Sequence, residues 1–511
     1  MQKKNLFASA ILMLCTLFVF TGCKEVMSSL DNPVSAYLKV DPASAKIYRG
    51  QSYKIPYSTI SNAKPIFTTA DDKVATVDEN GVVTGVMMGT TKITIEVPAT
   101  DYYQAASAEF TVEVDGLLKM PLLEKEMALN EEYNLGVTSV STGAITYTSS
   151  DVNVATVDAD GNVKAIACGD ATITVHIEAT PEYDRTEDLE FKAKVRIFDF
   201  ATLKTYCTAS EEPYVVLADN AIINLTSELN LTNKTKVEIA GSKEYPATIV
   251  VTDKSITIDK GLKLSNVIVD GSGQTATFIK GYKQANGKTY DPVESGQYVV
   301  TDPVVLEGIT AKGLQKAFYD CNSTAYVYVT FTINDCNIAY GTTSNVPLNF
   351  GSAMAINFNI TNSTFSAESM NANFIALSGK RPWQVTGFAS ETGKLIVDHC
   401  TFYNIAKAKQ FLNTNTLKGQ IYKYEMNSNI FVNTSNKKIY GNMTNNTNQV
   451  TTDGKNTYIF DGTFFAETNY NGDAGLQTDP NFKDAANGDF TPQGADQVAN
   501  KTGDNRWFET N

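Results

Sequence analysis

The sequence predicts an all-β chain in which two small β-sandwiches are followed by a parallel β-helix. Three observations carry this prediction. A strand–turn–strand pattern at residues 67–95 recurs at 147–175, short apolar segments recur through 198–511, and no long helical periodicity interrupts them. The length of 511 residues also favours two to four domains over one.

Composition excludes several classes of function. The chain has 42 basic and 56 acidic residues, a formal net charge of −14, and this balance argues against nucleic acid as a partner. Two histidines are too few for a His-rich metal centre. Seven cysteines are too sparse for a disulfide-stapled scaffold.

The first 23 residues have the pattern of an export signal. Lys3 and Lys4 precede an apolar stretch from residue 6 to 20, which is shorter than a membrane span. Gly22-Cys23 then resembles the lipobox of bacterial lipoproteins. The resemblance implies a signal peptide over 1–22, a diacylated Cys23 and a lipidated tether over 23–36. Removing 1–22 takes away two lysines, so the net charge becomes −16.

This reading also predicts a location. No later stretch of about 20 apolar residues exists, so the N-terminal lipid is expected to be the single attachment to the outer membrane. Lys24-Glu25 faintly resembles the acidic export tag of surface lipoproteins, which favours the cell-surface side. A plain secretory signal and a periplasmic orientation remain open alternatives.

The two repeats align without a gap at an offset of 80 residues. Val74–Val77 recurs as 154–157, and Asp78 and Gly81 recur as Asp158 and Gly161. Each repeat predicts a strand, a tight turn whose glycine needs a positive φ, and two further strands. The pattern resembles the bacterial immunoglobulin-like domain, group 2. The resemblance covers 37–115 and 116–197 and implies two immunoglobulin-like β-sandwiches.

These two domains are expected to act as rigid spacers that hold a distal domain away from the membrane. Four aspartates in their turns could also be read as cation ligands. Turn caps are the favoured interpretation, because aspartate commonly bonds its own backbone in turns. The four residues are Asp71, Asp78, Asp151 and Asp158.

The region 198–511 is rich in Asn and Thr, and Arg381 and Arg506 are its two arginines. Its apolar segments have central residues spaced by 41, 29, 27, 37, 29 and 34 positions. Short strands at such intervals predict the stacked coils of a parallel β-helix. The central residues are Ile268, Ile309, Ile338, Phe365, Phe402, Phe431 and Phe465, and the predicted turn column is Asn334, Thr361, Asp398, Asn427 and Asp461.

These segments resemble the pectate-lyase-like family, which implies a right-handed parallel β-helix over 198–511. The uncharacterised members found in surface lipoproteins of glycan-utilisation loci are especially similar. Residues 478–492 resemble a common ending of such proteins and are predicted to cover the open end of the stack. Cys336 and Cys400 are predicted to be reduced residues of the core.

Catalysis would need groups that are scarce here. A β-helix lyase of uronates uses acids that hold Ca²⁺ and an Arg or Lys base. Arg381 is a weak candidate for the base, Ca²⁺ stays possible, and no metal ligands are predicted. The paired aspartates of a polygalacturonase-like hydrolase are missing. Asp398 and His399 are adjacent, so as strand residues they are expected to point to opposite faces.

Two loops are candidate binding surfaces for a carbohydrate. In the first, Trp383 is expected to stack on a sugar ring while Lys380 and Arg381 meet a carboxylate. In the second, the insertion at 281–298 carries Tyr290. The alternatives are a loop that packs against the flank of the β-helix and a solvated loop.

The leading hypothesis is therefore a cell-surface lipoprotein that binds polysaccharide through a distal β-helix and is not an enzyme. Other outer-membrane components of glycan uptake are expected as further partners. The alternatives are a polysaccharide lyase or hydrolase acting on a uronate-containing glycan, and an adhesin or structural surface protein.

Overall fold

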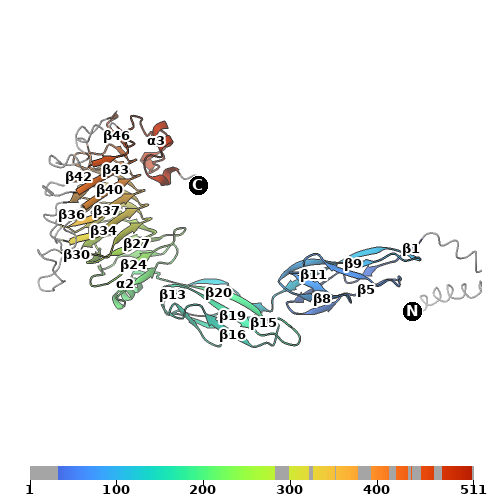
Figure 1. The fold of residues 1–511 in the computed structure, drawn as a ribbon. Coiled ribbons are helices and arrows are strands. Elements are labelled where there is room, and N and C mark those ends of the chain that lie inside the picture. Colours follow the sequence, from blue (N-terminus) through green and yellow to red (C-terminus); the bar gives the residue numbers. More distant parts are fainter. Residues whose placement is uncertain are drawn as a thin grey trace, which may run out of the picture. The chain divides into compact units, whose positions relative to one another are not determined.

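The computed structural model describes residues 33–281, 298–321, 326–351, 353–377, 393–413, 422–435, 439, 450–464 and 475–508. Strands dominate this part of the chain, which confirms the all-β prediction (Figure 1). The chain divides into two compact units, one with the two sandwiches and one with the β-helix. Across these residues, no helix is both long and apolar enough to cross a membrane.

The first sandwich packs a four-stranded sheet against a three-stranded sheet. In spatial order the larger sheet contains β3 (Ser44–Tyr48), β11 (Ala106–Asp115), β9 (Gly89–Val97) and β6 (Ile66–Thr69). The smaller sheet contains β4 (Ser52–Lys54), β8 (Val82–Gly85) and β7 (Ala75–Val77). Two short pairs complete it: β1 (Val34–Ser35) with β10 (Tyr103–Gln104), and β2 (Lys39–Val40) with β5 (Tyr57–Ser58).

The second sandwich repeats this topology. Its larger sheet contains β13 (Glu124–Ala128), β20 (Glu187–Arg196), β19 (Gly169–Ile177) and β16 (Ile145–Ser149). Its smaller sheet contains β14 (Glu132–Asn134), β18 (Asn162–Ala165) and β17 (Ala155–Val157), and β12 (Leu118–Lys119) pairs with β15 (Thr138–Ser139). Matching rings fill the two cores, since Tyr53 stacks on Phe110 at 5.8 Å and Tyr133 on Phe191 at 5.6 Å.

The turn aspartates cap backbone groups, as predicted. Oδ1 of Asp78 accepts hydrogen bonds from the amides of Asn80 and Val82, both at 2.8 Å. The following Gly81 has φ +74°, and a Cβ there would lie 2.6 Å from the ring of Phe67. Both the backbone conformation and the ring therefore require glycine at this position. The corresponding caps in the other turns belong to Asp71, Asp151 and Asp158.

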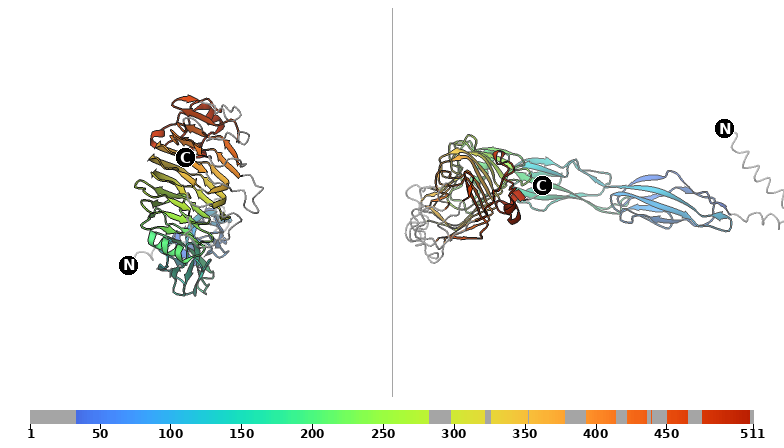
Figure 2. Two further views of the ribbon diagram at one scale, coloured as in Figure 1. Left: turned by 90° about the vertical axis from the view of Figure 1, so that its left-hand side faces the viewer. Right: turned by 90° about the horizontal axis from the view of Figure 1, so that it is seen from above.

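Three parallel sheets form the β-helix, in which the strands of each sheet stack coil upon coil (Figures 1 and 2). The first sheet contains β21 (Tyr214–Val216), β24 (Glu238–Ala240), β27 (Leu262–Ser265), β31 (Val304–Glu307), β34 (Tyr326–Asn334), β37 (Met354–Thr361), β40 (Gly393–Asp398), β43 (Tyr422–Asn427) and β45 (Val450–Thr452), with β30 (Tyr298–Val300) beside β34.

The second sheet follows the first in each coil. It contains β22 (Ile222–Asn224), β25 (Ala247–Val250), β28 (Val267–Asp270), β32 (Thr310–Leu314), β35 (Asn337–Thr343), β38 (Thr364–Met370), β41 (Thr401–Tyr403), β44 (Ile430–Val432), β46 (Thr457–Phe460) and β47 (Thr463–Phe464). The third sheet contains β23 (Leu229–Asn230), β26 (Ile256–Ile258), β29 (Ile279–Gly281), β33 (Tyr319–Asp320), β36 (Leu348–Gly351), β39 (Ile375–Leu377) and β42 (Leu412–Asn413).

A helix that the sequence did not predict precedes the first coil. In α2 (Phe200–Ala209), the buried residues Phe200, Leu203 and Cys207 join the core of the β-helix. Asp199 caps this helix, because its Oδ1 accepts a hydrogen bond from the amide of Thr202 at 2.9 Å. Ten residues with three buried positions are too short a pattern to stand out in a β-rich sequence.

The turn from the first to the second sheet repeats from coil to coil. Asn334, Thr361, Asp398 and Asn427 pair in register at the ends of β34, β37, β40 and β43, so most of the predicted turn column is confirmed. Asp461 is an exception, because it belongs to the antiparallel hairpin of β46 and β47. The left-handed conformation falls one residue later, at Asn266, Gly308, Asp335, Asn362, His399 and Ser428.

The next residue of this turn points into the core and builds a polar ladder. The amide of Cys400 donates to Oδ1 of Asn429 at 2.9 Å, and the amide of Asn429 donates to Oδ1 of Asn456 at 2.9 Å. Further back, the amide of Cys336 donates to Oγ of Ser363 at 3.1 Å. All five residues are buried, so each coil binds the one before it through side chain and backbone.

An apolar column lies beside this ladder on the second sheet. Ile338, Phe365, Phe402 and Phe431 are in register, as the spacing predicted, and Tyr458 continues them. Ile309 and Ile268 do not belong to this column, because Ala311 pairs with Ile338 and Ile268 pairs with Thr310. Phe465 lies outside the described residues. Cys336 and Cys400 are free and buried, as predicted.

Candidate functional site

The binding candidates taken from the sequence fall where the structure gives no description. Lys380, Arg381 and Trp383 lie outside the described residues, and so do Tyr290 and the expected lipidation site Cys23. Their predicted roles in carbohydrate binding, catalysis and membrane attachment therefore stay predictions.

The adjacent Asp398 and His399 do contact each other, so the prediction that they point to opposite faces is wrong. His399 is a turn residue with φ +52° and not a strand residue. Its Nδ1 lies 3.1 Å from Oδ1 of Asp398, and the hydrogen bond to this carboxylate raises the pKa of the imidazole. The pair lies in the recurring turn column, which gives it a structural role.

Part of the outer face of the second sheet is covered by another segment of the chain. Thr364, Thr401 and Thr457 stand in one register column and are fully buried, although they point away from the apolar core. Their cover is the last described stretch of the chain, residues 475–508, here called the C-terminal segment. It contains the helical turns η3 (Ala485–Asn487), α3 (Ala495–Asn500) and η4 (Asn505–Phe508).

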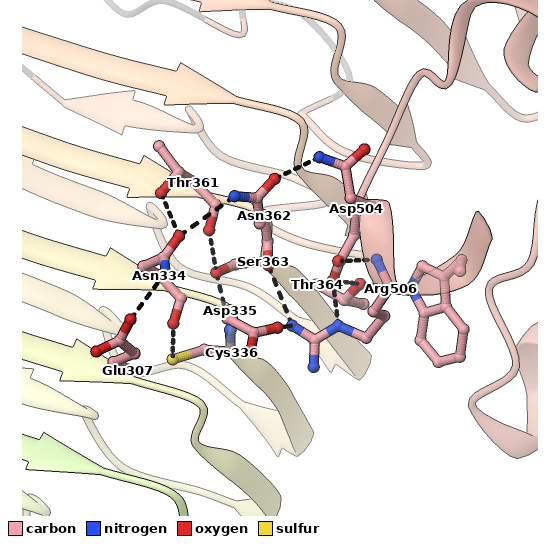
Figure 3. A network of polar contacts seen from close by, with 12 residues as sticks. Glu307, Asn334, Asp335, Cys336, Thr361, Asn362, Ser363, Thr364, Asp504 and Arg506 are labelled. Carbon is pink, nitrogen blue, oxygen red and sulfur yellow. Dashed lines mark hydrogen bonds and ion pairs between the residues drawn. The ribbon is translucent and has the colours of Figure 1, made fainter. Parts of the chain in front are cut away.

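Polar contacts fix the C-terminal segment to this column (Figure 3). The hydroxyl of Thr364 donates to Oδ2 of Asp504 at 2.7 Å and accepts a hydrogen bond from Nε1 of Trp507 at 2.8 Å. Arg506 donates from Nε to the same Oδ2 at 2.7 Å and from Nη2 to the carbonyl oxygen of Asn362 at 3.1 Å. The segment is thus bound to residues that are 140 to 144 positions earlier in the chain.

This placement corrects the expectation that residues 478–492 close the end of the stack. From Asn456 in the last coil, contacts of the C-terminal segment run back along the side of the stack to Asp335, which lies 3.4 Å from Nη2 of Arg506. Gln497 marks the start of this path, since its Nε2 donates to Oγ1 of Thr457 at 2.9 Å. The segment is therefore a strap along several coils.

Asp504 is the buried charge of this attachment. Its side chain is fully buried, and burial raises the pKa of its carboxyl to about 6, although Arg506 and the hydroxyl of Thr364 act in the opposite direction. A carboxylate taken out of water is tolerated when cations and donors surround it. Asp504 therefore holds the strap through a cluster of donors and not through an exposed ion pair.

An aromatic cluster attaches the middle of the strap to β41. The ring of Tyr403 lies 6.2 Å from Phe482 and 5.4 Å from Phe490, and Phe490 lies 6.0 Å from Trp507. Trp507 is thus a packing residue of the strap. Tyr403 is half-buried, so part of its ring remains accessible beside the strap.

Next to this cluster lies a groove of about 460 Å³ between the second sheet and the strap. Its floor comes from β35, β38 and β41, where Ala339, Ser366 and Tyr403 stand in register. Its far wall is the 485–490 turn of the strap. Glu368, Asn404 and Asn487 add polar side chains to the lining.

The lining combines an accessible aromatic ring with a few hydrogen-bonding groups on a floor of small residues. Seven of the fourteen lining residues are Gly or Ala, which lets a ligand approach the backbone closely. A concave surface with a few convergent polar groups is the usual form of a small-molecule or glycan subsite. Among the residues that the structure describes, no group of three or more His, Cys, Asp or Glu side chains is placed to hold a metal ion.

The sequence did not predict this groove, because the lining residues of its floor (313–404) and of its wall (485–490) are at least 81 positions apart in the chain. One signal was present in the sequence. Thr364 and Thr401 begin two strands whose outer face would be expected to be solvated, and a repeated small polar residue there is compatible with a covering segment. No local sequence pattern around the strap residues Asp504 and Arg506 predicts which residues they contact.

Two family models match parts of the chain. The bacterial Ig-like domain (group 2) matches residues 37–112 and 133–181, and a domain of unknown function (DUF5123) matches residues 395–507. The chain therefore contains bacterial Ig-like domains, as predicted. Two such domains and a parallel β-helix fit a surface protein. The second match covers the last coils together with most of the strap.

Among curated proteins, an uncharacterized protein of Clostridium acetobutylicum is 30% identical over 127 residues. These are 23% of this chain and 12% of that protein, so the chain spans only a small part of this relative. Similar solved structures include domains 4 and 5 of the S-layer protein SbsC, at 16% identity and a TM-score of 0.16, covering 32% of this chain and 99% of that one.

Drosophila N-cadherin EC1-4 has 12% identity and a TM-score of 0.14, covering 32% of this chain and 50% of that one. The endo-fucoidan hydrolase MfFcnA4 from glycoside hydrolase family 107 has 12% identity and a TM-score of 0.15, covering 32% and 30%. Scores this low give no information on activity.

Proposed function

We propose that this protein is a cell-surface lipoprotein that binds polysaccharide. In this proposal a lipid on Cys23 anchors it to the outer membrane, the two Ig-like domains act as spacers, and the β-helix binds the glycan without cleaving it. The observation that carries the proposal is the groove between the second sheet and the strap. Components of glycan uptake in the outer membrane are the proposed further partners.

The groove is suited to a glycan because its lining groups complement both the apolar face and the polar rim of a sugar ring. The face of a pyranose presents C–H bonds, which suit the exposed part of the Tyr403 ring, whereas its rim presents hydroxyls. Ser366, Asn404 and Asn487 supply donors and acceptors for those hydroxyls.

The test is affinity electrophoresis of residues 24–511, without the lipid, in gels that contain single plant or host polysaccharides. At least one glycan is expected to retard the wild type, and Tyr403→Ala is expected to weaken the interaction roughly tenfold, about 1.4 kcal/mol. Tyr245→Ala is the matched control, since Tyr245 is 47% exposed and lies outside the groove. Its mobility should equal that of the wild type.

A second variant separates binding from damage to the aromatic cluster. Ser366→Tyr places a ring on the groove floor and leaves the contacts of Tyr403 with Phe482 and Phe490 in place. It is expected to abolish retardation while the thermal unfolding curve stays close to that of the wild type. Unchanged retardation of both groove variants would exclude the groove as the binding site.

A further inference from the structure

Glu368 is the one charged side chain among the fourteen residues that line the groove. It lies on β38, is exposed, and its Oε2 accepts a hydrogen bond from Oγ1 of Thr342 at 3.4 Å. No salt bridge to Glu368 is found within the described part of the chain. Its carboxylate is thus open to a ligand in the groove.

Two lysines that are within two positions of lining residues in the chain, Lys312 and Lys483, lie close to other acids. Lys483 of the strap lies 3.1 Å from Asp489, and Lys312 of β32 lies 3.5 Å from Asp270. Neither lysine lines the groove. To an anionic ligand, the lining therefore presents amide and hydroxyl groups but no positive charge.

A carboxylate can only accept hydrogen bonds. The hydroxyls of an uncharged sugar are donors, and two neighbouring hydroxyls can reach the two oxygens of one carboxylate. The carboxylate of a uronate or the sulfate of a sulfated glycan would instead meet a like charge. At the separations of a groove such repulsion weakens binding roughly tenfold or more.

We infer that Glu368 is the specificity residue of the groove and restricts it to uncharged glycans, whose hydroxyls donate to its carboxylate. This inference rests on the proposed function, because it assumes that the groove binds a glycan. It excludes polyuronates and sulfated polysaccharides as ligands, and with them the substrates of a uronate lyase, at this site.

The experiment compares two sets of probes on residues 24–511 at physiological salt. The uncharged set contains starch, galactomannan, xyloglucan and β-glucan, and the anionic set contains polygalacturonate, alginate and dextran sulfate. Wild type is expected to bind within the uncharged set alone. Glu368→Gln is expected to lose about fivefold in affinity for the uncharged glycan, because a carboxamide is a weaker acceptor and one of its two positions is a donor.

Glu244→Gln is the matched control, since it removes an exposed acid of the β-helix that does not line the groove. Glu244→Gln should not change the affinity of the protein for either set of glycans. Both variants alter exposed side chains, so equal melting temperatures are expected and show that the fold is intact.

The outcomes separate this inference from the proposed function. If an anionic glycan retards the wild type and Ser366→Tyr abolishes that retardation, the groove binds glycans but the inferred ligand class is wrong. Unchanged affinity of Glu368→Gln for an uncharged glycan also overturns the role of Glu368. Absence of retardation by every glycan in both sets instead removes the proposed function itself.

Discussion

The hydroxyl of Thr364 donates to Oδ2 of Asp504 over 2.7 Å, although the two residues are 140 positions apart in the chain. Both side chains are fully buried. This contact joins the outer face of a coil in the middle of the β-helix to the strap, and the strap forms one wall of the groove. The stability of the strap is therefore a condition for the site.

Arg506→Ala is expected to loosen the strap by roughly 3 kcal/mol, because it leaves the buried carboxylate of Asp504 without its cation. The value is at the low end for buried pairs, since the side chain of Arg506 is 22% exposed. Fluorescence of Trp507 during urea unfolding measures this, in a Trp383→Phe background so that one tryptophan reports. Lys483→Ala, which breaks an exposed pair of the same strap, should cost less than about 1 kcal/mol.

The strap should also become less stable as the pH rises from 4 to 7. Burial raises the pKa of Asp504 from 3.8 to about 6, so the attached state binds this proton more tightly than the detached state. Its stabilising contribution is complete below pH 4 and is lost as the pH passes 6, with a size on the order of 3 kcal/mol. Trp507 fluorescence at several pH values measures it.

Asp504→Asn is the control for this pH dependence, because it removes the titrating carboxyl. Asp398 raises the pKa of His399, and a raised imidazole pKa gives a contribution of the same sign, so both proteins are compared in a His399→Gln background. A pH profile of Asp504→Asn as steep as that of the parent would contradict the assignment to Asp504.

Asn429→Leu is expected to destabilise the last coils by about 2 to 4 kcal/mol. Its side chain bonds the amide of Cys400 and the carbonyl of Val397, and the apolar replacement leaves both backbone groups buried without these partners. Ser363→Ala is the milder comparison at the same position of another coil, with an expected loss of about 1 kcal/mol. Urea unfolding followed by circular dichroism distinguishes the two losses.

Gly81→Ala is expected to unfold the first sandwich more easily, by about 2 kcal/mol or more. The new Cβ would lie 2.6 Å from the ring of Phe67 and adds to the cost of φ +74°. Gly136→Ala is the matched control in the second sandwich, because it has φ +60° but its nearest contact is an ordinary one, 3.4 Å from Pro121. Gly136→Ala should lower the free energy of unfolding by only about 1 kcal/mol. Equal losses of stability for both variants would show that the clash with the ring of Phe67 adds nothing to the cost of Gly81→Ala.

The cysteines of residues 24–511 should resist alkylation in the folded protein. All five are buried and free, and burial raises the pKa of Cys207 and Cys336 to about 12 and that of Cys321 to about 11. Little thiolate is therefore present at pH 8. Mass spectrometry after iodoacetamide treatment should find no label in buffer and five labels in urea.

Local patterns in the sequence were sufficient to predict the two sandwiches and the presence of the β-helix coils. The 80-residue repeat encodes complete turns, in which Asp78 bonds residues only two and four positions away. The coil pattern likewise comes from neighbours, and Ile338, Phe365, Phe402 and Phe431 took their predicted places. One prediction was wrong where a turn contains a left-handed residue, because His399 was treated as part of a strand. Ile268, Ile309 and Asp461 also fell outside their predicted columns.

The groove could not be predicted, since nothing local links the strap to the second sheet. Asp504 and Arg506 look like ordinary residues of a polar tail until Thr364 and Asn362 are seen beside them. The local pattern of an aromatic beside two cations pointed instead to Lys380, Arg381 and Trp383, and those residues lie outside the described part of the chain.

The strap has a consequence for synthesis. Coils that pair only with their neighbours can assemble in order as the chain leaves the ribosome, from α2 onward. The outer side of Thr364 and Thr401 must wait for its cover, because Asp504 is made 140 and 103 residues later than these two threonines. The nascent protein thus keeps part of this face exposed to water until the strap has been made, and a chain that terminates before the strap would carry the coils without their groove.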